Sequence, residues 1–160
     1  MDEIEREAPD TVVLLGDLLY HGPRNDLPSG YAPKEVAAML NTLADSVVAV
    51  RGNCDAEVDQ MVLDFPMMAD YALIVDGAHQ LFCTHGHLKA PGQLPTPPKG
   101  ATVLSGHTHV KVNECLDVRM PDGSVLPTVS AVNPGSVSIP KDGSNSFAVY
   151  QDGEFELRDL

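Results

Sequence analysis

The chain has 160 residues, 43% of them hydrophobic, and a formal net charge of −13 at pH 7, which predicts one compact domain over residues 1–160. This acidic balance predicts no nucleic-acid-binding surface, because nucleic acids and anionic lipids require clustered Lys and Arg. No apolar run is long enough for a membrane span, no signal-peptide core follows Met1, and three widely spaced cysteines favour reduced thiols, so we expect a cytoplasmic protein.

Four short apolar runs predict buried strands, since runs of this length bounded by turn residues are typical of a sheet interior. Each run stops at or beside a glycine and leads to an Asp, Asn or His. The runs span residues 12–15, 47–50, 81–83 and 102–105. Ligands of open sheets collect outside the carboxyl ends of the strands, so the repeated pattern indicates a metal site.

Between the first two runs, residues 34–44 place apolar side chains at helical spacing after Pro33 and predict an amphipathic crossover helix. A shorter helix is expected over residues 56–63. Beyond residue 70 the pattern is mostly β, which together with the first half predicts a mixed two-sheet layer fold with helices outside. The features expected there are a hairpin over 71–83, a proline-containing loop over 91–98, and hairpin turns at Asp122-Gly123 and Asp152-Gly153.

The ends of the four runs supply five candidate metal ligands. On an extended chain His107 and His109 face the same side, about 6.6–6.8 Å apart, so each can reach one of two ions spaced about 3.5–4 Å. Asp17 can bridge both ions and offset their charge, while Asn53 offers a neutral oxygen and His85 a nitrogen. Mixed nitrogen and oxygen ligands suit Mn²⁺, Fe²⁺, Zn²⁺, Co²⁺ or Ni²⁺.

Each of these residues also has a structural interpretation. Taken singly, Asp17 and Asn53 are turn residues, and His85 is a hydrogen-bonded histidine. The segment Asn133-Pro134-Gly135-Ser136 is most simply a tight turn. The metal interpretation is favoured only because the four strand-end sites occur together. Four further residues are considered for substrate contact, against a structural or solvated role: His21, Arg24, Cys54 and His87.

Five motifs, in this order, resemble those of the calcineurin-like metallophosphoesterase superfamily, and in particular its small bacterial phosphodiesterases of the YfcE type. The resemblance covers nearly the whole chain. It implies an α/β fold, an αββα sandwich of two mixed β-sheets flanked by helices, with a dinuclear metal centre that hydrolyses small phosphoesters. The motifs are Gly16-Asp17, Gly52-Asn53-Cys54-Asp55, Thr84-His85-Gly86-His87, Gly106-His107-Thr108-His109 and Asn133-Pro134-Gly135-Ser136.

Carried over by position, the resemblance implies that Asp17 bridges both ions and that His109 completes the first. The second ion would be held by Asn53, His85 and His107, and catalysis would rest on Asp17, Asn53 and His85 around a metal-bridged hydroxide. Manganese is the ion we expect first. The alternative function is a catalytically impaired scaffold for protein binding, because the retromer subunit of the same superfamily is a docking platform.

The chain departs from the family pattern at two places. The family opens with a strand ending in Asp-x-His, and no such motif precedes Asp17. Residues 1–10 resemble the tail of the family's first helix, so we expect a domain truncated at its N-terminus, with an open sheet edge through which copies could form a homo-oligomer. Cys54 stands where many members carry the histidine that protonates the leaving group. This change predicts a preference for good leaving groups, or another proton donor such as His87 or water.

Overall fold

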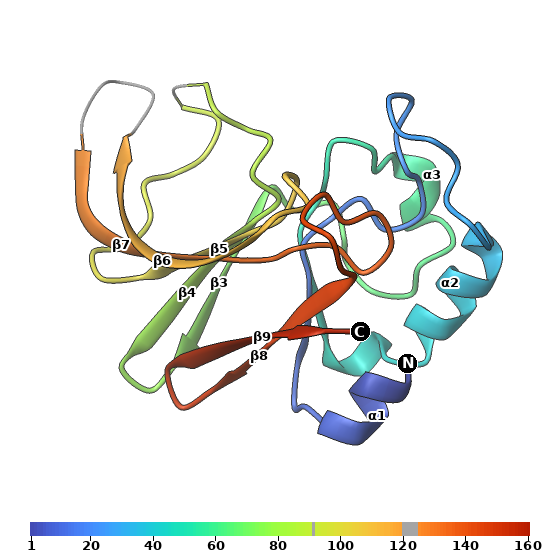
Figure 1. The fold of residues 1–160 in the computed structure, drawn as a ribbon, viewed down its shortest axis with the longest axis horizontal. Coiled ribbons are helices and arrows are strands. Elements are labelled where there is room, and N and C mark those ends of the chain that lie inside the picture. The colour runs from blue at the N-terminus through green and yellow to red at the C-terminus, as the bar shows by residue number, and fades with distance from the viewer. Residues whose placement is uncertain (91, 120–124) are drawn as a thin grey trace.

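The computed structural model describes residues 1–90, 92–119 and 125–160. Figure 1 shows its helices gathered on one side, beside β1 and β2, and its long strands on the other. The helices are α1 (Asp2–Glu7), α2 (Pro33–Asn41) and α3 (Glu57–Gln60), with a 3-10 turn at Ala44–Ser46. The strands are β1 (Val12–Leu14), β2 (Val47–Ala49), β3 (Tyr71–Asp76), β4 (His79–Thr84), β5 (Thr102–Ser105), β6 (Lys111–Arg119), β7 (Val125–Pro134), β8 (Ser146–Gln151) and β9 (Glu154–Asp159).

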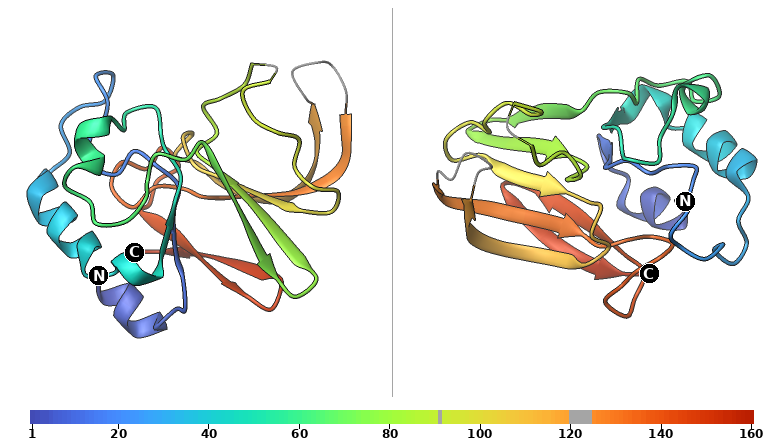
Figure 2. Two further views of the ribbon diagram at one scale, coloured as in Figure 1. Left: turned by 180° about the vertical axis from the view of Figure 1, so that it is seen from behind. Right: turned by 90° about the horizontal axis from the view of Figure 1, so that it is seen from above.

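The strands form one mixed sheet and two separate pairs. The sheet has the order β3-β4-β5-β7-β6, in which β5 pairs in parallel with both β4 and β7, and the outer pairings are antiparallel. The pairs are parallel β1–β2 and antiparallel β8–β9. In Figure 2 the β8–β9 pair lies against the five-stranded sheet. The predicted layered α/β sandwich is therefore confirmed, and its second layer consists of two strand pairs that are not hydrogen-bonded to each other.

Two hydrophobic clusters hold the layers together. The first packs Ala37 of α2 against Ala49 of β2, with Phe65 and Met67 buried below them. The second lies between the strand layers. It joins Leu81 and Cys83 of β4, Leu104 of β5 and Val132 of β7 with Tyr150 of β8 and Phe155 of β9. Both clusters contain residues of the first two strands or their ends, so the ends of β1 and β2 are fixed between the two cores.

The predicted elements match the structure closely in the first half. The four apolar runs are β1, β2, β4 and β5, and the predicted helix after Pro33 is α2, which ends at Asn41 where a 3-10 turn follows. The second helix ends at Gln60 instead of residue 63. The reason is that the Gln60 amide bonds the backbone carbonyls of Leu63 and Phe65 and the N–H of Met67, and so supports a non-helical reversal.

The second half is mostly β, as predicted. The hairpin β3–β4 is confirmed, and so is the turn between β8 and β9, where Asp152 and Gly153 have φ of 51° and 90°. Residues 92–98 form a loop, whereas Pro91 and the turn predicted at Asp122-Gly123 lie outside the described residues. Within the part of the chain that the structure describes, no helix is long and apolar enough to cross a membrane.

Candidate metal centre

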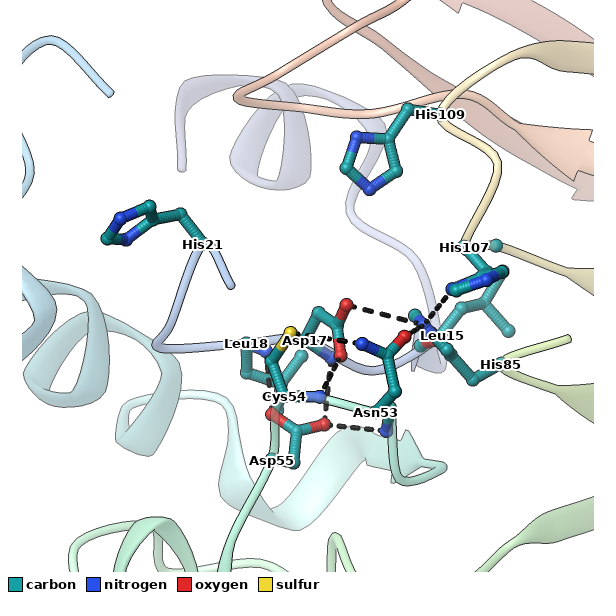
Figure 3. A network of polar contacts seen from close by, with 12 residues as sticks. Leu15, Asp17, Leu18, His21, Asn53, Cys54, Asp55, His85, His107 and His109 are labelled. Carbon is teal, nitrogen blue, oxygen red and sulfur yellow. Dashed lines mark hydrogen bonds and ion pairs between the residues drawn. The ribbon is translucent and has the colours of Figure 1, made fainter. Parts of the chain in front are cut away.

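Four polar side chains meet where β1, β2, β4 and β5 end at their carboxyl ends (Figure 3). Asp17 follows β1, Asn53 follows β2, and His85 and His107 follow β4 and β5. Because β1 is parallel to β2 and β4 is parallel to β5, each pair of loops leaves the strands on the same side. The ligand atoms of Asp17, His85 and His107 lie within 4.8 Å of one another. The structure thus brings one residue from each strand end into a single group.

The loops after β1 and β2 touch backbone to backbone. Gly16 has a φ of +90°, and a Cβ there would overlap the main chain of Gly52, while a Cβ on Gly52 would overlap the Asp17 carboxylate. Buried Asp55 joins the two loops: one carboxylate oxygen accepts the N–H groups of Asp17 at 2.8 Å and Gly52 at 2.7 Å, and the other accepts Leu18 N–H at 2.9 Å. These bonds hold Asp17 at a φ of 57°, a conformation that costs a non-glycine residue energy.

The His85 ring, 2% exposed, is fixed in one orientation. Its Nδ1 lies 2.5 Å from the carbonyl oxygen of Leu15, so Nδ1 donates its proton there, and Nε2 carries the lone pair in the neutral ring and a second proton in the charged one. Nε2 lies 3.1 Å from Oδ1 of Asn53 and 3.3 Å from Oδ2 of Asp17. Nδ1 of His107 is 3.2 Å from the same atom. With both rings neutral, several electron-pair donors therefore face one another.

The spacing of these donor atoms fits a bound metal ion. Nitrogen and oxygen ligands lie roughly 2.0–2.2 Å from a transition metal, so neighbouring ligands of one ion are about 2.9–3.5 Å apart. The distances of 3.1–3.3 Å around Nε2 of His85 agree with this spacing. A proton or a cation is needed to offset the repulsion between such donors. The carboxylate, amide and imidazole donors suit a divalent transition metal.

The surroundings of the group shift the pKa values of His85 and His107 in opposite directions. Burial acts to raise the pKa of Asp17, but hydrogen bonds from His85 and from the Cys54 N–H at 2.8 Å outweigh it and lower that pKa below 3.8. Burial opposes a charge on His85, yet its bonds to Asp17 and to the Leu15 carbonyl raise its pKa above 6.5. Burial and the neighbouring His85 lower the pKa of His107. A metal ion therefore competes with a proton mainly at His85.

His109 lies apart from this group. In Figure 3 its ring stands away from Asp17 and His85, and it does not belong to the group within 4.8 Å. Its Nδ1 donates a hydrogen bond to the carbonyl oxygen of Ile139 at 2.8 Å. In the neutral ring Nε2 therefore carries the lone pair that can bind a metal ion. The Lys141 N–H bonds the His109 carbonyl at 2.9 Å. His109 is thus oriented as a ligand would be, but it contributes no atom to the first group.

Two of the residues considered for substrate contact border the ligand group. The sulfur of Cys54 accepts a hydrogen bond from the Asn53 amide at 3.1 Å, and burial together with the charge of Asp17 raises the pKa of this thiol to about 11. The ring centroid of His87 lies 5.3 Å from that of His85 and 6.3 Å from that of His107. Its Nδ1 is buried without a hydrogen-bond partner among the described residues.

The other two residues lie on the loop after β1. His21 packs edge-on against Tyr20 and Tyr31, with centroids 4.8 Å and 5.2 Å away, and Figure 3 shows it apart from the ligand group. Arg24 is exposed on the same loop. A Cβ on Gly22 would come within 2.9 Å of the Cys54 sulfur, so this loop rests on the rim of the site.

Sequence reasoning missed two parts of the site. The carbonyl of Leu15, which orients His85, belongs to the main chain and leaves no signal in the sequence. Asp55 lies two positions after the candidate ligand Asn53, and its place in the Gly-Asn-Cys-Asp motif is its only signal. Both act on other residues of the site rather than reaching its centre.

Comparisons with known proteins agree with this geometry. The family model for the calcineurin-like phosphoesterase superfamily domain matches residues 1–152. Phosphodiesterase YfcE of Escherichia coli strain K12 is 49% identical over 133 residues, which cover 83% of this chain and 67% of that protein. A solved structure of E. coli YfcE, described as a phosphoesterase, superposes with a TM-score of 0.82 at 42% identity, over 94% of this chain and 78% of that one. An archaeal phosphodiesterase shares the fold, with a TM-score of 0.62 at 20% identity over 99% and 88% of the two chains.

Proposed function

Because this chain belongs to the calcineurin-like phosphoesterase superfamily, we propose that it is a metal-dependent phosphodiesterase that hydrolyses small phosphodiesters. The observation that carries this proposal is the convergence of the donor atoms of Asp17, Asn53 and His107 on Nε2 of His85, at 3.1–3.3 Å. A divalent metal bound there would supply an activated water and would offset the charge of the phosphoryl oxygens.

The chain's own residues hold and orient this centre. Asp17 stays ionised at neutral pH, because hydrogen bonds keep its pKa low, and so supplies the negative charge that attracts a cation. The Leu15 carbonyl keeps Nε2 of His85 turned toward the ligand group. Asn53 is exposed, so the centre is open to solvent on its side and a small phosphoester can reach it.

The residues on the rim suggest what kind of ester reaches the site. The side chain after Asn53 is the thiol of Cys54, and a thiol is a poorer proton donor to a leaving group than an imidazolium ion. We therefore infer a preference for esters with good leaving groups. Arg24 carries a positive charge that acts on Cys54, and no carboxylate lies within ion-pair distance of it among the described residues. Arg24 and His87 are the side chains we propose for contact with the phosphoester, with His21 shaping the loop.

The identity of the metal, the cellular location and the oligomeric state are proposed from the sequence. Manganese as the native ion, with nickel, iron, cobalt or zinc as alternatives, follows from the ligand types. A cytoplasmic location and homo-oligomerisation remain predictions. The family match over residues 1–152 supports a single domain.

The test is hydrolysis of bis(p-nitrophenyl) phosphate by the purified protein with Mn²⁺ and with a chelator. We expect activity only with the metal, weak because the family's Asp-x-His motif is absent from the sequence, and a loss of about two orders of magnitude or more in kcat/KM for Asp17→Asn and His107→Ala. His79→Ala, which changes an exposed histidine at the start of β4, is the matched control. Near-full activity in either site variant would show that the assignment is wrong. A folded protein inactive with every divalent metal tried would favour the protein-binding scaffold.

A further inference from the structure

The loop that carries His107 and His109 has a strained backbone. Both residues have positive φ, 65° and 59°. A non-glycine residue in this region costs about 1–3 kcal/mol and persists only where the surrounding structure holds it. Something outside the loop must therefore fix the conformation in which the two rings are presented.

Asn133 provides this support. It lies near the end of β7, next to β5, and is only 3% exposed. Its side-chain nitrogen donates to the carbonyl oxygen of Gly106 at 2.8 Å and to the hydroxyl oxygen of Thr108 at 3.0 Å. Its side-chain oxygen accepts the N–H of Gly135 at 2.9 Å. Both donors of the amide thus hold the histidine loop, and the acceptor holds the residue's own turn.

The turn that begins at Asn133 also orients His109. Ser136 accepts the N–H groups of Ser138 and Ile139 on its hydroxyl oxygen, at 3.4 Å and 3.1 Å. These bonds place the carbonyl of Ile139, which accepts the Nδ1–H of His109. A histidine ligand is typically oriented by a hydrogen bond from its second ring nitrogen. The segment predicted as a tight turn therefore contacts the loop of both histidines.

We propose that Asn133 is a positioning residue of the metal centre, whose amide fixes the left-handed loop at Gly106–His109 and so sets the direction of the two ring nitrogens. This inference rests on the proposed metal-binding function. A purely structural role for Asn133 would require only that its own turn form. A turn of this kind needs only the bond from the side-chain oxygen to Gly135 N–H, which an aspartate supplies equally well. The two bonds from the side-chain nitrogen are not needed by the turn.

This difference defines the experiment. Asn133→Asp keeps the turn bond and removes the bond to the Gly106 carbonyl, which can only accept, while the Thr108 hydroxyl can only donate to the new carboxylate. Co²⁺ is titrated into wild-type and variant protein, with the visible absorption of the bound ion as the readout of its coordination. We expect Asn133→Asp to weaken Co²⁺ binding about ten- to a hundredfold and to change the spectrum of the bound ion. Far-ultraviolet circular dichroism without metal checks that the variant is folded.

Asn41→Asp is the matched control, because its side-chain nitrogen also donates to a backbone carbonyl, that of Val62 at 2.9 Å, and its oxygen also accepts a backbone N–H, that of Asp64 at 3.0 Å, at the end of α2 and away from the histidine loop. It should bind Co²⁺ as the wild type does. Should Asn133→Asp fail to fold, Thr108→Val removes a single bond from an exposed side chain and should still weaken binding severalfold. If the folded Asn133→Asp variant, or Thr108→Val used in its place, binds Co²⁺ with wild-type affinity and spectrum, the positioning role of Asn133 is wrong. The proposed metal-binding function would still stand. A wild-type protein that binds no Co²⁺ overturns the proposed function itself.

Discussion

The carboxylate of Asp55 accepts the backbone N–H of Asp17 at 2.8 Å, although 38 positions separate the two residues. The same oxygen accepts the N–H of Gly52, and the second oxygen accepts that of Leu18. One buried carboxylate thus sets the separation of the loop that carries Asp17 from the loop that carries Asn53. Since a metal ion needs its ligands at fixed distances, Asp55 supports the centre without reaching it.

Asp55→Asn should lower the free energy of unfolding by about 3 kcal/mol in the absence of metal. The amide keeps one acceptor oxygen and turns an NH₂ group toward backbone N–H donors, so at least one bond to a charged group, worth about 1.5–3 kcal/mol, is lost. Urea denaturation measures the change. Asp59→Asn is the control, since Asp59 accepts one N–H, that of Ala56 at 2.9 Å, at the start of α3, and should lose about 1 kcal/mol or less. Equal losses in the two variants would contradict the special role of Asp55.

The residues that end each strand could be predicted from the sequence, because their signal is local. An apolar run that stops at a glycine and leads to Asp17 or His85 shows both the strand and the position of the polar side chain at its end. The contacts between these loops are not local. Asn133 bonds residues more than twenty positions earlier in the chain, so its segment showed only the turn that it also forms.

Contacts between residues of different elements also explain where the structure departs from the predicted elements. Apolar spacing favoured a helix through residue 63, but the side chain of Gln60 satisfies three backbone groups of the following segment and allows the helix to end early. The strand order, for which the sequence made no prediction, also depends on non-local contacts, since β5 pairs with β7 rather than with β6, the next strand in the chain. Periodicity within one element carries no information on either contact.

Metal binding should show one strong site and one weak site in the 160-residue chain. One ion can be surrounded by Asp17, Asn53, His85 and His107. A second ion beside it would be bound only by His109 and by Asp17, which it would share with the first ion. Titration with Mn²⁺ and metal analysis after gel filtration measure the two affinities. His85→Ala should remove the strong site and His109→Ala should leave it nearly unchanged. Two ions retained at full occupancy with micromolar or tighter affinity would refute this ligand assignment.

The three cysteines should react with iodoacetamide in a fixed order when metal is absent. Cys115 is exposed and should react first. Burial and the charge of Asp17 raise the pKa of Cys54 to about 11, so roughly one molecule in a thousand carries the reactive thiolate at pH 8. Burial raises the pKa of Cys83 to about 12. In the folded protein, peptide mapping should find Cys54 modified slowly and Cys83 unmodified. In urea all three cysteines should react at the same rate. Rapid labelling of Cys54 in the folded protein would contradict the surroundings described for its sulfur.

The ion pair of Asp17 and His85 should make the stability of the metal-free protein depend on pH. The pKa of His85 is raised above 6.5 on folding, so its contribution is fully present below pH 6.5 and is lost as pH rises through the higher folded value. The pKa of Asp17 is lowered below 3.8, so its contribution is present above pH 3.8 and is lost as pH falls through the lower folded value. The pair therefore stabilises the fold most between these two limits.

Urea denaturation of the metal-free wild type and of Asp17→Asn, at several pH values, isolates this contribution as the difference between the two proteins. The difference should be largest between pH 3.8 and 6.5 and should shrink as His85 loses its proton. With saturating Mn²⁺ the dependence should reverse above pH 6.5, because an ion binds only the deprotonated ring and is held more tightly as pH rises. A difference that stays constant as pH rises would mean that His85 is neutral throughout, and a metal effect independent of pH would mean that His85 is not a ligand.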